Sequence, residues 1–212
     1  MSRLALLLPF AFASHLAVAQ TDQPIGLDAE RNLMELGSST NATMVRTYDN
    51  RYEGIKGTPY FMEEWAKATI YANNTLFENV EVKYNVYDDE ILYRNPKGKE
   101  YILKPFKIDS FVLQDGSTQQ EYTFRKFPAL AAEDAKLAQH FVLVLHEGKE
   151  VQLVMVPLKH LVKANYKGPY SAGNKFDELQ DLQSYYLLGP DKAVRKLKLN
   201  KKSLLKALPG DS

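Results

Sequence analysis

The chain has no cysteine among its 212 residues. This excludes disulfide bonds, cysteine nucleophiles and thiolate metal sites, so we expect apolar packing and backbone pairing to hold the fold. It also leaves no cysteine that could carry a lipid anchor. An exported domain without disulfides fits a bacterial cell envelope better than a eukaryotic secretome.

Neither sign of charge is in excess: 27 Lys and Arg face 26 Asp and Glu. If the first 19 residues are removed, Arg3 goes with them, and 26 basic residues then face 26 acidic ones. Proteins that bind nucleic acid usually carry a net basic surface. The balance therefore disfavours a nucleic-acid partner.

Long apolar runs are missing except at the start of the chain. Arg3 precedes the apolar stretch Leu4–Phe12, and Ala17-Val18-Ala19 supplies the small residues of a cleavage site before Gln20. This pattern is typical of a secretory signal peptide, and the stretch is too short for an uncleaved membrane anchor. We expect residues 1–19 to be cleaved near Ala19. The mature chain is then periplasmic or extracellular, without a transmembrane span.

The mature chain divides into a polar arm and one domain. Residues 20–57 are weakly patterned and predict a partly ordered arm, with a short helix between Asp28 and Gly37. Residues 58–212 carry short β-prone runs separated by turn residues, which indicates a single β-rich domain.

The clearest strand is Val80–Tyr87, in which Val80, Val82, Tyr84 and Val86 share one face. This alternation predicts one buried and one wetter face, as antiparallel sheets allow. The other predicted strands are Lys67–Tyr71, Thr75–Phe77, Glu90–Arg94, Glu100–Leu103, Ile108–Leu113, Tyr122–Phe127, Phe141–His146, Val151–Val156, Ser184–Leu188 and Ala193–Leu199. Their regular spacing predicts a mainly β fold, an antiparallel meander that curls into a barrel or a sandwich.

Two further elements have specific predictions. Phe141–His146 and Val151–Val156 are nearly continuous in apolar residues, so we expect them to form a hairpin at the centre of the sheet. Residues 129–139 predict one short helix after Pro128, and residues 201–208 predict a basic C-terminal helix capped by Asn200. The basic end could contact anionic lipid head groups of the envelope. A solvated cationic end is the competing interpretation.

Three parts of the mature chain carry a resemblance. The block Asn41–Gly54 with Gly57–Phe61, the segment Val82–Tyr93, and Ser184–Leu188 followed by Lys201–Leu205 together resemble a family of uncharacterised exported β-rich proteins of Bacteroidota. The resemblance implies a single domain in a periplasmic or secreted location. It implies no reaction, cofactor or catalytic residue.

Motifs that carry chemistry are absent. The sequence has no Gly-x-Ser-x-Gly elbow, no phosphate-binding glycine loop and no His-Glu-x-x-His pair. His140, His146 and His160 do not have metal-ligand spacing, and Asp88-Asp89-Glu90 reads as a hairpin turn rather than a calcium loop. We therefore predict no catalytic residue, no metal ligand and no cofactor.

Tyrosine is the unusual feature, with 13 residues in the chain. Tyr84 and Tyr87 point to opposite sides of their predicted strand, so one of them has to leave the core face. An outward tyrosine can stack on a sugar ring or a partner, although it often packs across strands instead. Tyr87 and Tyr93 are the candidate contacts for a ligand or partner, such as a glycan or another cell-envelope component.

The leading interpretation is a non-enzymatic binding or structural module of the cell envelope. A second is a carrier that holds a small apolar ligand in a lipocalin-like cavity of the curled sheet. A third is a hydrolase whose site is assembled only in space, in which His140, His146 or His160 lies within reach of a carboxylate.

Overall fold

The computed structural model describes residues 31, 33, 50–165, 175–190, 193–198, 200 and 203, together with the backbone of 45–46. The predictions for the signal peptide and for most of the C-terminal helix lie outside these residues. Of the predicted N-terminal helix, Arg31 and Leu33 are described; both are helical, and Leu33 is buried. None of the described residues belongs to a helix long and apolar enough to cross a membrane.

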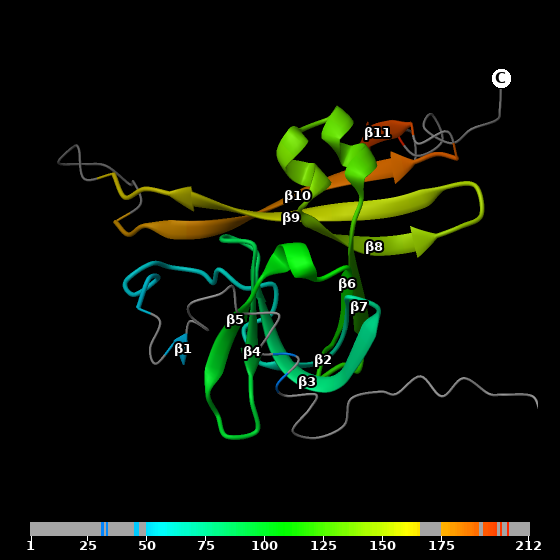
Figure 1. Ribbon diagram of the computed structural model, residues 1–212. Helices are drawn as coiled ribbons and strands as arrows, with labels where there is room; N and C mark the ends of the chain where they lie inside the picture. The colour runs from blue at the N-terminus through cyan, green and yellow to red at the C-terminus, as the bar shows by residue number, and fades with distance from the viewer. Residues whose placement is uncertain are drawn as a thin grey trace, which may run out of the picture.

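Strands dominate the described residues, which confirms a mainly β fold (Figure 1). The strands are β1 (Val45–Arg46), β2 (Ala66–Ala72), β3 (Thr75–Asn85), β4 (Glu90–Arg94), β5 (Glu100–Leu103), β6 (Ser110–Gln114), β7 (Glu121–Lys126), β8 (Phe141–Glu147), β9 (Gln152–Val162), β10 (Glu178–Leu188) and β11 (Val194–Leu197). Three short 3₁₀ helices lie between them: η1 (Pro105–Lys107), η2 (Pro128–Ala132) and η3 (Ala135–Ala138).

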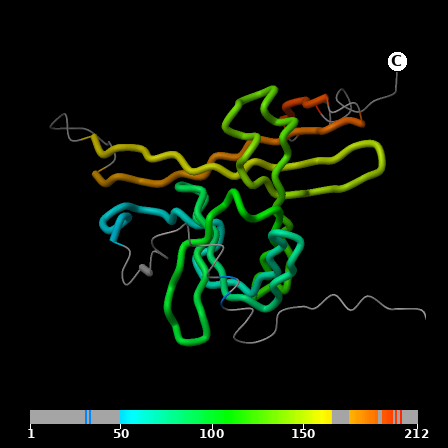
Figure 2. Tube along the Cα trace, viewed as in Figure 1, coloured from blue at the N-terminus to red at the C-terminus, as the bar shows by residue number. Residues whose placement is uncertain are grey.

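The strands form one antiparallel sheet in the order β1-β5-β4-β3-β2-β6-β7-β8-β9-β10-β11. Among the described residues no ladder joins β1 to β11, so the sheet is open and not the closed barrel that the sequence allowed. It curls instead: β2–β7 form a curved lower part, and the long strands β8–β10 cross above it (Figure 1). Figure 2 shows β9 and β10 running side by side to both sides of this lower part.

Residues that favour turns fix two of the hairpins. Asn73 and Asn74 take φ values of 50° and 59°, and they close the turn between β2 and β3. This left-handed region is one that asparagine tolerates better than most residues. In the turn between β4 and β5, Gly98 has a φ of 77° and donates its N–H to the carbonyl of Asn95 at 2.8 Å.

The main core lies inside the curl. Val82, Tyr84 and Val86 are buried and Val80 is half-buried, as the alternation predicts. Asn85, which the same alternation places on the wetter face, is buried instead. Tyr84 meets the rings of Phe111, Phe124 and Phe141 at centroid distances of 5.4, 5.3 and 6.1 Å. Four aromatic side chains from four strands therefore fill the concave face.

A second core lies on the other face of β8–β10, under η2 and η3 (Figure 1). It contains Leu130, Leu137, Val142, Val154, Val156, Tyr186 and Leu188. Both faces of the middle part of β8 and β9 are thus covered, which explains their nearly continuous apolar runs. The two strands form the predicted hairpin, but they are the eighth and ninth of eleven in the sheet order and do not lie at its centre.

The single helix predicted over residues 129–139 is wrong. The chain makes two 3₁₀ helices, because Asp134 takes an extended conformation with φ −154° between them. The Asp134 side chain accepts the N–H of Lys136 at 2.9 Å and so caps η3. An aspartate that can bond its own backbone favours a new cap over a continuing helix.

Candidate functional site

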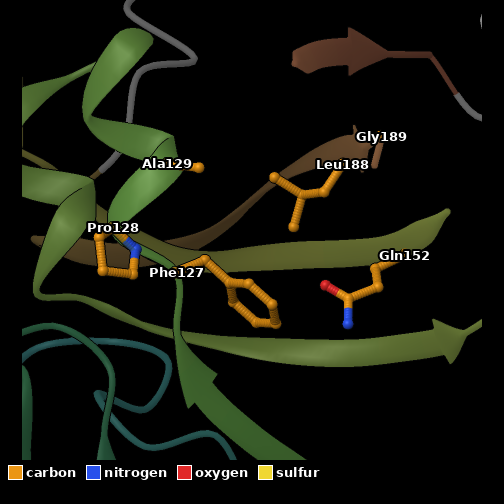
Figure 3. Close-up of a pocket in the computed structure, with 6 residues that line it drawn as sticks. All are labelled: Phe127, Pro128, Ala129, Gln152, Leu188 and Gly189. Atoms are coloured by element: carbon orange, nitrogen blue, oxygen red, sulfur yellow. The ribbon is translucent and has the colours of Figure 1, made fainter. Parts of the chain in front are cut away.

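An apolar pocket opens between η2 and the ends of β9 and β10 (Figure 3). Its volume is about 360 Å³, within the usual range for small-molecule sites. The lining residues are Phe127, Pro128, Ala129, Gln152, Leu188 and Gly189. None of them is charged, so the pocket suits an uncharged ligand.

Three separate segments build this pocket. Phe127 is extended and precedes Pro128, whose fixed φ starts η2 directly above the sheet. Leu188 ends β10, and the N–H of Gly189 donates to the carbonyl of Ala193 at 3.0 Å. This turn holds the Leu188 side chain opposite Phe127 (Figure 3).

Gln152 supplies the polar side chain of the pocket. Its amide nitrogen donates to the Glu147 carboxylate at 3.2 Å, across the hairpin of β8 and β9. That contact orients the amide, and Figure 3 shows its oxygen on the side of Phe127. A ligand hydroxyl could donate to this oxygen while its apolar part contacts Phe127 and Leu188.

The structure separates the two candidate tyrosines. Tyr87 lies in the turn after β3, is 39% exposed, and meets Tyr52 edge to face at 6.2 Å. Tyr93 is 3% exposed and stacks on Tyr101 inside the core. Tyr87 therefore has a partly exposed ring, whereas Tyr93 is a packing residue. Neither tyrosine lines the apolar pocket.

The acidic turn after β3 is held by a polar network rather than left in solvent. Arg51 pairs with Asp88 at 2.5 Å and with Glu90 at 2.7 Å. The Tyr52 hydroxyl donates to Asp88, and burial together with that hydrogen bond raises the pKa of Tyr52. The carboxylates thus fasten the end of the N-terminal arm and are not arranged around a metal ion. Within the described part of the chain, no group of three metal-ligating side chains could hold one.

Asn85 links this network to the sheet. It is fully buried, its amide donates to the Tyr52 hydroxyl at 2.8 Å, and its carbonyl accepts the N–H of Asp88 at 3.0 Å. This side-chain contact to the backbone turns the chain and ends β3 at Asn85, two residues before the predicted end. The strand prediction missed this, because an asparagine within alternating residues does not reveal its partners.

Replacing Asn85 with alanine should leave the Asp88 N–H and the Tyr52 hydroxyl without these partners. We expect Asn85→Ala to lower the free energy of unfolding by about 1–3 kcal/mol, as for other buried unsatisfied groups. Urea denaturation measures the loss. Gln180→Ala, at an exposed position of β10, is the control and should change stability by less than about 0.5 kcal/mol. Equal effects of the two substitutions would contradict the role given to Asn85.

His140 does lie within reach of a carboxylate: its Nδ1 is 3.5 Å from Asp89 Oδ1. Its other ring nitrogen, Nε2, is 3.0 Å from the carbonyl oxygen of Pro157. In a Ser-His-Asp site that second nitrogen faces the nucleophile. Here a backbone carbonyl occupies the position, so the pair does not have the geometry of a hydrolase.

A second hollow, of about 290 Å³, lies beside Trp65 and the turn between β6 and β7. The guanidinium of Arg94 lies over the Trp65 ring, 4.5 Å from the ring centroid. Asp115 accepts the hydroxyl and N–H of Ser117, both at 2.7 Å, and these bonds lower the pKa of Asp115 to about 2. The Trp65 ring and the Asp115 carboxylate are therefore already in contact with neighbouring side chains. The apolar pocket is the stronger candidate for a ligand site.

The sequence predicts an outward tyrosine and an acidic turn after the Val80 strand, and the structure has both, but no pattern in the sequence predicts the apolar pocket. The pocket brings together residues that lie up to 62 positions apart in the sequence, from Phe127 to Gly189. No local pattern predicts that such distant segments meet. Pro128 marks the start of a helix in the sequence, but nothing in the sequence shows that this helix meets the end of β10. No protein-family model, curated protein or solved structure matches this chain.

Proposed function

We propose that this protein is a non-enzymatic binding module of the cell envelope, exported with the help of its N-terminal 19 residues. Its ligand is a short aliphatic chain that carries a hydroxyl head group. The apolar pocket beside η2 is the observation that carries the proposal: it has an uncharged lining, a volume of about 360 Å³ and one polar side chain, Gln152. Sites of this size with few polar groups are typical of small-molecule binding.

The pocket differs from the lipocalin-like cavity of the second interpretation of the sequence. Inside the curl, Tyr84, Phe111, Phe124 and Phe141 are fully or almost fully buried and contact one another. Side chains thus occupy the space that a carrier of that kind keeps for its ligand. The proposed ligand lies instead on the outer face, against Phe127 and Leu188.

A binding assay with a matched pair of variants tests the proposal. The probe is 1-aminoanthracene, a neutral fluorescent compound, displaced by octan-1-ol. Ala129→Trp adds a ring at the pocket wall, whereas Ala132→Trp adds the same ring at an exposed position of the same 3₁₀ helix. The first variant fills the ligand space, and the second does not.

We expect the unchanged protein to bind the probe saturably and to release it to octan-1-ol. Ala129→Trp should weaken binding by about tenfold or more, which corresponds to about 1.4 kcal/mol of lost contact. Ala132→Trp should stay within about twofold of the unchanged protein. Absence of saturable binding, or equal binding by both variants, would exclude the pocket as the site.

Tyr87 favours a second candidate function, contact with a glycan. Its ring is partly exposed beside the charged pair of Arg51 and Asp88, and exposed aromatic rings with polar neighbours suit sugar faces. A glycan array with Tyr87→Ala as control tests this. Signals that persist unchanged in Tyr87→Ala would exclude the residue.

A further inference from the structure

His140 lies at a junction of elements that are distant in sequence. It follows η3 and precedes β8, and its side chain is mostly buried. One ring nitrogen faces Asp89, in the turn between β3 and β4, at 3.5 Å. The other faces the carbonyl of Pro157, in β9, at 3.0 Å. The imidazole thus bridges two parts of the sheet between which the described residues form no direct backbone ladder.

Both partners of the ring are hydrogen-bond acceptors. A backbone carbonyl can only accept, so Nε2 has to carry a proton for its contact with Pro157. An ionised carboxylate also only accepts, so the Asp89 contact requires a proton on Nδ1. A neutral imidazole has one N–H and can satisfy one partner, whereas the imidazolium satisfies both. The geometry therefore matches the charged form of His140.

The surroundings of the ring support this state. The Tyr84 hydroxyl in β3 donates to the same Asp89 oxygen at 2.8 Å. Burial lowers the pKa of His140, but the hydrogen bond and charge of Asp89, with the Pro157 carbonyl, outweigh it and raise the pKa above its usual value near 6.5. The net direction favours a protonated ring.

One cation also faces this cluster. Lys126 in β7 acts on Asp89 by its charge, and burial lowers the pKa of Lys126. Its ammonium donates to the carbonyls of Pro105 and Ile108 at 2.5 and 2.9 Å. The negative charge of Asp109 counteracts part of the effect of burial on the pKa of Lys126. Lys126 is thus held by other acceptors, and Asp89 remains the carboxylate facing His140.

His140 contacts Pro157 close to the position where β9 stops pairing with β8. The pairing of β8 with β9 ends at Leu143 and Met155. Pro157 has no N–H to continue a ladder, which is why proline suits the edge of a sheet. From Pro157 to Val162, β9 pairs only with β10 among the described residues. The His140 ring supplies the contact that β8 no longer makes.

We propose that His140 is a proton-dependent latch that fastens the β3–β4 turn to β9 at the point where β8 stops pairing. This inference does not rest on the apolar pocket. The charged ring holds both partners, and loss of its proton releases one of them. The part of β9 and β10 beyond Pro157 is then held less firmly.

The direction of the pH effect follows from the raised pKa. The stability from this contact is present in full below about pH 6.5, the ordinary histidine pKa. It is lost as the pH rises through the higher value in the folded protein. Mild acid therefore tightens the latch, and an alkaline shift loosens it.

Amide hydrogen exchange of the full chain tests the latch. Protection factors are measured at about pH 6 and about pH 9, which bracket the histidine transition. Amides in residues 158–162 and 178–183 report on the outer part of β9 and β10, and those of β2 and β3 serve as the internal reference. His140→Gln removes the titration. His160→Gln changes an exposed histidine on β9 and is the control.

We expect the unchanged protein and His160→Gln to lose roughly tenfold in protection of the reporter amides at the higher pH, since a charge-assisted hydrogen bond is lost. His140→Gln should show less than about twofold change, because it has no charge to lose. An equal pH response in His140→Gln would overturn the proposal.

Proton NMR titration of the His140 ring provides a second, independent measurement if His140→Gln does not fold. A pKa above the usual histidine value supports the latch. A pKa at or below the usual value overturns the latch, because two contacts that favour the charged ring would have to raise it.

Discussion

Phe124→Ala is expected to remove about 3–5 kcal/mol from the free energy of unfolding, the usual range for a buried phenylalanine truncated to alanine. Phe124 is completely buried and stands at the centre of the curl. Its ring lies 4.8 Å from the Phe111 ring, 5.0 Å from Phe61 and 5.3 Å from Tyr84, centroid to centroid. The substitution leaves a cavity that rigid neighbours from three other segments cannot close.

Urea denaturation at constant pH measures the loss. Phe106→Ala is the matched control, because Phe106 is 72% exposed in η1, and it should change stability by less than about 0.5 kcal/mol. Since domains of this size have only about 5–15 kcal/mol in total, Phe124→Ala should be unfolded well before Phe106→Ala. Similar denaturation midpoints would show that the aromatic cluster is not the main core.

Gly57→Ala is the second substitution with a large expected effect. Gly57 has a φ of 81°, and a Cβ placed there would lie 2.5 Å from the Leu179 carbonyl oxygen. The preceding residue, Lys56, donates its N–H to the Asp177 carbonyl, and its own carbonyl accepts the N–H of Leu179. The alanine methyl group therefore pushes this short segment away from β10, and both backbone bonds are strained.

Gly54→Ala separates the two causes of that effect. Gly54 has a similar φ of 78° but nothing within 4 Å of its Cβ position. Gly54→Ala should lower the free energy of unfolding by about 1 kcal/mol, because only the positive φ is unfavourable for alanine there. Gly57→Ala should lower the free energy of unfolding by about 2–4 kcal/mol, because the steric contact with Leu179 adds to the effect of the positive φ. Thermal and urea unfolding measure both variants, and equal losses would contradict the close approach to Leu179.

Much of the fold follows from local patterns in the sequence. The alternation at Val82, Tyr84 and Val86, the paired Asn73 and Asn74, and the apolar hairpin around Gly148 all predict what the structure shows. These features work because period-two burial and positive φ are properties of a few adjacent residues.

Contacts between distant segments could not be predicted in this way. Tyr93 has the same local character as Tyr87, yet it stacks on Tyr101 in the core because β5 pairs beside β4. His140 meets Asp89 only because the sheet curls. The direction of each side chain depends on the register of strands far away in the chain, which one sequence does not specify.

The apolar pocket is also lined by residues from segments that are far apart in the sequence. Its ability to bind a small apolar ligand is the central claim. Methyl NMR of the full chain, titrated with octan-1-ol, tests it most directly. We predict saturable shifts of the Ala129 and Leu188 methyl signals, while those of Ile91 and Leu103, buried in the main core, stay in place. Shifts of the Ile91 and Leu103 methyls, or none at Ala129 and Leu188, would contradict the proposed site.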